Sequence, residues 1–61
     1  MRIELTSEEV MFLKEALSGE ISELGMEIAD TDQKDFRDHL KRRKAILMNL
    51  LDRIEKAAVA A

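Results

Sequence analysis

The centre of the chain reads Glu27-Ile28-Ala29-Asp30-Thr31-Asp32-Gln33-Lys34-Asp35-Phe36, and the apolar residues on its two sides are arranged symmetrically about Asp32. The pairs that lie at equal distances from Asp32 are Ile28 and Phe36, Leu24 and Leu40, Leu17 and Leu47, Leu13 and Leu51, and Val10 and Ile54. Two antiparallel helices of similar length need apolar side chains at equal distances from the turn that joins them. The symmetry therefore predicts an all-α fold, an antiparallel two-helix hairpin that reverses at Asp32.

The predicted hairpin takes up the whole chain, residues 1–61, as a single domain. Thr6 and Glu9 have the spacing of a capping box, in which each side chain accepts a hydrogen bond from the backbone N–H of the other residue. We therefore expect the first helix at about 7–29, a turn at 30–32, and the second helix at about 33–56, with Asp32 as its cap. The small residues at 57–61 are expected to fray.

Length and composition limit the kinds of protein that this chain can be. A domain of 61 residues buries only about 60% of the surface that its unfolded chain exposes. The chain has no cysteine for a disulfide or a thiolate zinc site, so we expect self-association to supply the missing stability. It also lacks a run of about 18 apolar residues and a signal-peptide segment, and we expect a cytoplasmic protein.

Charge is divided unequally between the two halves of the chain. Residues 1–30 contain eight acidic and two basic residues, a net charge of −6, whereas residues 31–61 contain five acidic and eight basic residues, a net charge of +3. Opposite charges favour the antiparallel pairing of the two halves. The total of −3 argues against a general attraction to nucleic acid or to an anionic membrane.

One side of the predicted hairpin is apolar near the chain ends and charged near the turn. When the two apolar stripes face each other on helical wheels, five residues share this side: Phe12, Ala16, Gly19, Ile46 and Leu50. A single pair of helices cannot cover Phe12. We therefore predict that this side is a dimer face and that two copies form a four-helix bundle, with a tetramer and a swapped parallel arrangement as alternatives.

Arg43 lies where the symmetry calls for an apolar residue to match Ile21. We expect its aliphatic stem to pack on Ile21 and its guanidinium to reach Glu20, or an acidic residue of the partner copy, which would fix the register of the helices. An anion site at Arg43 is the alternative.

His39 is the one histidine, and a metal site needs three or four converging ligands, so we interpret His39 as a surface or interface residue that makes the dimer sensitive to pH.

The basic run Lys41-Arg42-Arg43-Lys44 is the only charge run in the chain. Successive residues of a helix point in different directions, so at most two of the four share a surface. We interpret the run as solvated or ion-paired, and the alternative is that Lys41 and Arg42 contact phosphates.

The chain has no nucleophile beside a histidine and no glycine-rich loop, so we predict no enzymatic activity and neither a cofactor nor a metal.

The pattern Glu27-Ile28-x-x-Thr31-Asp32-x-x-x-Phe36-Arg37-x-x-Leu40, with the opening Leu5-Thr6-x-Glu8-Glu9, resembles short bacterial proteins of uncharacterised function that consist of little more than a helical hairpin. This resemblance implies the fold and no activity.

The plasmid copy-number control protein that binds paired RNA loops is similar in length and plan, but it reads RNA with a basic face of its first helix, whereas the first helix here is acidic. We therefore interpret the chain as a non-enzymatic protein interaction module that acts as a homodimer, and the alternative is a nucleic-acid-binding regulator that uses the second helix.

Overall fold

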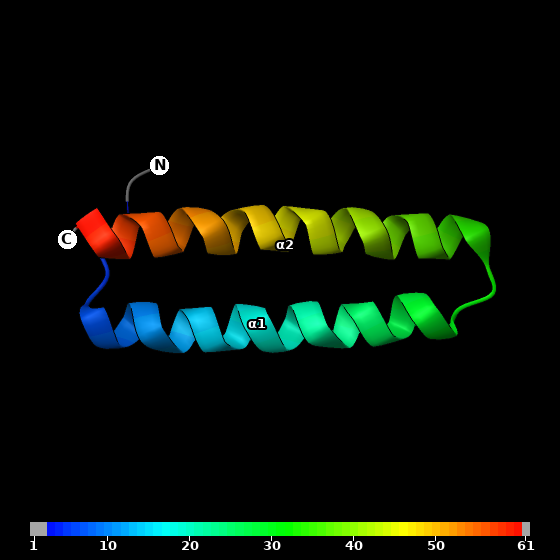
Figure 1. Cartoon of the computed structure of the whole chain (residues 1–61), viewed down its shortest axis with the longest axis horizontal. Helices are drawn as coiled ribbons and strands as arrows, with labels where there is room; N and C mark the ends of the chain where they lie inside the picture. The colour runs from blue at the N-terminus through cyan, green and yellow to red at the C-terminus, as the bar shows by residue number, and fades with distance from the viewer. Residues whose placement is uncertain (1–2, 61) are drawn as a thin grey trace.

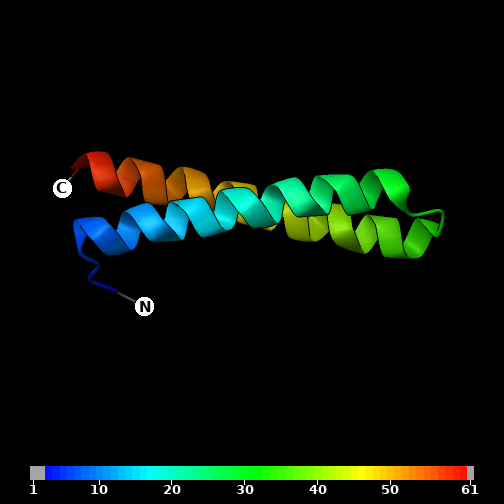
Figure 2. The same ribbon diagram turned by 90° about the horizontal axis from the view of Figure 1, so that it is seen from below.

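The predicted helical hairpin is confirmed in the computed structural model, which describes residues 3–60 and the side chains of residues 3–57. Helix α1 runs over Ser7–Asp30 and helix α2 over Lys34–Ala60. The two helices lie side by side and antiparallel (Figure 1). Seen from the perpendicular direction, they cross at a small angle (Figure 2). The hairpin measures 42 × 20 × 15 Å.

A complete capping box fixes the start of α1, as predicted. The Glu9 N–H donates to Thr6 Oγ1 at 3.1 Å, and the Thr6 N–H donates to Glu9 Oε1 at 2.9 Å. These bonds satisfy two backbone donors that a helix start would otherwise leave unpaired. The helix therefore begins at Ser7, directly after its cap.

The turn lies one residue further along the chain than predicted. Thr31 ends α1 in an extended conformation, and its N–H donates to the Glu27 carbonyl at 3.0 Å, which carries the helix through Asp30. Because α1 gains this residue, the connection moves to 31–33. Gln33, and not Asp32, then directly precedes α2, and the Gln33 carbonyl accepts from the Arg37 N–H at 2.9 Å.

The seam between the helices is centred on three leucines. Leu24 is 3% exposed, Leu40 is 4% exposed and Leu17 is 9% exposed, and they are the only buried apolar residues of the described part of the chain. Leu24 and Leu40 both lie eight positions from Asp32, as the symmetry requires. The outer pairs of the stripe are half-buried, because one seam between two helices leaves its edges open to water.

Phe36 departs from the predicted stripe, because its side chain is 47% exposed. It was expected to pack against Ile28, which is only half-buried. Phe36 lies in the first turn of α2, and α1 ends at Asp30. Little of α1 therefore extends far enough to cover the phenyl ring.

Helix α2 continues beyond its predicted end at Lys56 and reaches Ala60. Lys56 Nζ forms an ion pair with Asp52 Oδ2 at 3.0 Å, one turn earlier. Pairs at this spacing stabilise a helix by about 0.2–0.5 kcal/mol. Fraying was expected over 57–61, and Ala61 lies outside the described residues.

Over the part of the chain that the structure describes, neither helix combines the length and the apolar character needed to cross a membrane.

Candidate interaction surface

The five residues of the predicted dimer face, which we call the Phe12 face, are all exposed in the hairpin: Phe12, Ala16, Gly19, Ile46 and Leu50. Phe12 is 58% exposed, Ile46 is 57% exposed and Leu50 is 38% exposed. Three large apolar side chains on one side of a small protein form the kind of patch that marks an interaction site. The hairpin therefore leaves this part of its surface unpacked.

An ion pair on the Phe12 face joins the two helices. Arg43 Nη2 lies 3.4 Å from Glu20 Oε1, and these side chains are 58% and 39% exposed. Glu20 lies one turn from Ala16, and Arg43 lies one turn from Ile46, so the pair shows that the two flanks share a side. An exposed pair contributes about 0–1 kcal/mol to stability, and its role in fixing register stays a prediction.

Gly19 has no neighbour within the hairpin that requires a glycine. A Cβ atom added to Gly19 would meet no atom within 4 Å, whereas one added to Gly25 would lie 3.7 Å from Lys44 Nζ. A glycine inside a helix costs about 1 kcal/mol relative to alanine. The space above Gly19 is thus open in the single chain, on the same side as Phe12.

His39 and the basic run lie between the turn and the apolar part of the Phe12 face. A shallow hollow is lined by His39, Arg42, Arg43, Ile46 and Leu47. Within the described residues, no group of three histidine, cysteine or acidic side chains is close enough to hold a metal ion. The predicted roles of His39 stay predictions.

The four residues of the basic run diverge, as expected for consecutive residues of a helix. Lys41, Arg42 and Arg43 are exposed, whereas Lys44 is half-buried beside Gly25. Arg43 is held by Glu20. Lys41 and Arg42, the residues of the alternative phosphate contact, make no ion pair within the described part of the chain.

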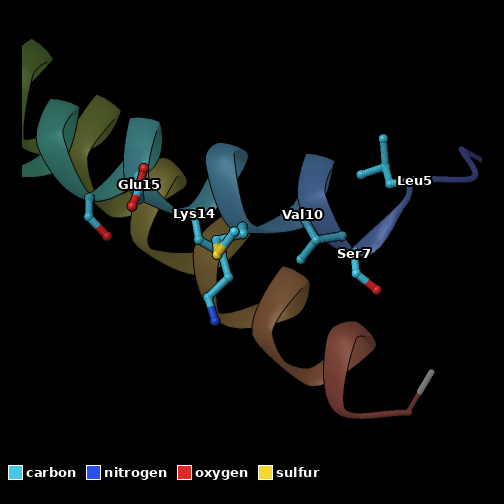
Figure 3. A pocket seen from close by; sticks show the side chains of 7 residues that line it. Leu5, Ser7, Val10, Lys14 and Glu15 are labelled. Carbon is cyan, nitrogen blue, oxygen red and sulfur yellow. The ribbon is translucent and has the colours of Figure 1, made fainter.

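The opposite side of the hairpin, which we call the Met11 face, mixes apolar and polar residues. Met11 is 55% exposed and Met48 is 52% exposed. Figure 3 shows a hollow on this side, with Leu5 from the segment before α1 at its edge and Lys14 extending from α1. The residues that line this hollow are Leu5, Ser7, Val10, Met11, Lys14, Glu15 and Ser18. Polar groups separate the two methionines, so this side presents less continuous apolar surface.

Sequence reasoning missed the part that Arg37 plays at the turn. Its guanidinium Nη2 donates to the Thr31 carbonyl, which links the start of α2 to the end of α1. Its Nε is buried and has no hydrogen-bond partner among the described residues. Helix α1 ends without a basic residue in its last turn, so its terminal carbonyls need a donor from elsewhere. The lack of a basic residue at the end of α1 was therefore the feature of the sequence that could have predicted an arginine donor just after the turn.

No family model, curated protein or solved structure that we compared with this chain matches it.

Proposed function

We propose that the chain is a small, non-enzymatic, cytoplasmic protein interaction module that acts as a homodimer, in which two hairpins pack through their Phe12 faces into a four-helix bundle. The observation that carries this proposal is the exposure of Phe12 and Ile46, each more than half open to water, and helical wheels assign both to the same side. Burying such side chains contributes about 1.5–3 kcal/mol each. A second copy offers apolar surface of the same extent.

The size of the hairpin supports this arrangement. A side of the molecule that measures 42 by 20 Å offers about 800 Å², which is the area that each partner contributes to a standard protein interface. Three buried leucines form a small core for a chain of this length. Dimerisation would add a second seam and would bury the flank of each helix that the hairpin leaves wet.

The substitution Phe12→Asp tests the proposal by sedimentation and helicity. We expect this variant to lose the dimer and most of its helix content at micromolar concentration, because an aspartate at the interface would be desolvated without a partner. Met11→Asp is the matched control, because Met11 directly precedes Phe12, is similarly exposed and belongs to the Met11 face. The control should retain the dimer. Dimerisation by both variants would show that the Phe12 face is not the interface.

The second candidate function is nucleic-acid binding through Lys41 and Arg42. It is favoured by one observation, which is that both side chains are exposed and have no ion-pair partner in the described part of the chain. A phosphate surface gives binding that weakens steeply with salt. Lys41→Glu and Arg42→Glu should then reduce the salt slope, and an absence of binding at low salt would eliminate this function.

A further inference from the structure

We propose that the two hairpins of the dimer pair with both turns at the same end of the bundle, so that α1 of each copy packs against α2 of its partner. This inference rests on the proposed dimer and specifies the symmetry with which its two copies pair. Two hairpins that pack face to face have two simple two-fold arrangements. In the same-end arrangement α1 lies beside the partner's α2, and in the opposite-end arrangement α1 lies beside the partner's α1.

Along the Phe12 face, the large apolar residues lie toward the chain ends and most of the charged residues lie toward the turn. Phe12 lies twenty positions from Asp32, Leu50 eighteen and Ile46 fourteen, whereas Glu23 and Arg42 lie nine and ten positions from it. In the same-end arrangement, residues at equal distances from the turn meet across the interface. Phe12 then lies near the level of the partner's Leu50 and the partner's Arg53, and Glu23 lies near the level of the partner's Arg42.

The opposite-end arrangement would place apolar residues against charges. The two-fold axis would cross α1 at its midpoint, and α1 runs over Ser7–Asp30. Phe12 would then lie level with position 25 of the partner, between the partner's Glu23 and the partner's Glu27. An exposed phenyl ring would then be buried against two carboxylates that lose water and gain no partner. The same-end arrangement instead places Phe12 against the partner's Leu50 and the aliphatic stem of the partner's Arg53.

Charge complementarity points to the same arrangement. The Phe12 face of α1 carries Glu20 and Glu23, whereas that of α2 carries Arg42, Arg43 and Arg53. In the same-end dimer, Glu23 lies at the level of the partner's Arg42, and neither residue has an ion pair within the described hairpin. In the opposite-end dimer, the same two-fold axis would place Arg42 level with the partner's Asn49, so this pair of opposite charges would be lost.

The distance between the two turns tests this symmetry directly. The chain has no cysteine, so Asp32→Cys allows one spin label per copy at the exposed turn. In the same-end dimer the two labels should lie within about 25 Å, because neighbouring helices pack about 8–10 Å apart. In the opposite-end dimer they would be separated by roughly the length of the hairpin, 42 Å.

The possible results separate this inference from the proposed function. A dimeric sample with the short distance supports both. A dimeric sample with the long distance overturns the same-end symmetry and leaves the homodimer standing. A monomeric sample in sedimentation, with no intermolecular distance, overturns the proposed function and this inference with it.

A charge exchange supplies an independent test that needs no label. We expect Glu23→Arg and Arg42→Glu each to weaken the dimer about ten-fold, because each places like charges at two symmetric sites. When the two variants are mixed, every such site regains an opposite pair, so the heterodimer should form in preference to either homodimer. Glu15→Arg mixed with Lys41→Glu is the matched control, because both residues are exposed and lie off the Phe12 face. Random mixing of Glu23→Arg with Arg42→Glu would overturn the inference.

Discussion

Leu24→Ala should remove a large part of the stability of the protein. Leu24 is 3% exposed and lies level with Leu40, which is 4% exposed, at the best-packed point of the seam. Truncation of a buried leucine to alanine costs about 2.7–5 kcal/mol, and the lower values belong to sites that can collapse around the cavity. A seam with open edges can partly collapse, so we expect a loss of about 3 kcal/mol.

This loss is large for a chain of 61 residues, whose total stability should be about 3–9 kcal/mol at the usual value per residue. The midpoint of thermal unfolding should fall by about 12–24 °C, since 1 kcal/mol shifts it by about 4–8 °C in small domains. Circular dichroism at one fixed protein concentration measures the shift, because the proposed dimerisation would make the midpoint depend on concentration.

Met26→Ala is the control for this experiment. Met26 is 65% exposed, and a substitution at such a site should change stability by less than about 0.5 kcal/mol. If Leu24→Ala cost no more than Met26→Ala, the helices would not meet at the level of Leu24 and Leu40, and the reasoning from symmetry about Asp32 would be refuted.

Three further predictions concern the ends of the helices and the glycine at the seam. Thr6→Ala should lower stability by about 1 kcal/mol in thermal unfolding, because the Glu9 N–H loses its acceptor; an unchanged midpoint would contradict the role of the capping box. Arg37→Met should cost about 1 kcal/mol and speed amide exchange at the turn, since the Thr31 carbonyl loses its donor, and unaltered exchange there would argue against that link. Gly25→Ala should raise stability by up to about 1 kcal/mol, because its nearest new neighbour is the flexible end of Lys44 at 3.7 Å, and a lower midpoint would mean that the helices approach more closely at this point.

The hairpin itself was predictable because its symmetry depends only on the spacing of the apolar residues. Leu24 and Leu40 are equidistant from Asp32, and the antiparallel geometry brings such residues together wherever the ends of the helices lie. The ends were less predictable. The position of the turn depends on one hydrogen bond, from the Thr31 N–H to the Glu27 carbonyl, and single bonds of this kind leave little trace in residue spacing.

The candidate surface stays a prediction from helical wheels. The wheels place Phe12 and Ile46 on one side, and both side chains are exposed in the hairpin. The link that Arg37 makes across the turn depends on the reach of a long side chain, which periodicity does not encode. The exposure of Phe36 has a similar cause, because it follows from where α1 stops and not from the position of Phe36 in the apolar stripe.

The physical case for association is a mismatch: the chain has more large apolar side chains than one hairpin can bury. Leu17, Leu24 and Leu40 are buried, whereas Phe12 and Ile46 are more than half exposed. The proposed second copy would correct this mismatch and would leave the Met11 face free for another protein.

Sedimentation equilibrium combined with circular dichroism over a dilution series tests this account most directly. The account predicts a species of twice 7.0 kDa at micromolar concentration, which loses helix content as it dissociates on dilution. A particle of 7.0 kDa that stays fully helical at the lowest concentration would contradict it.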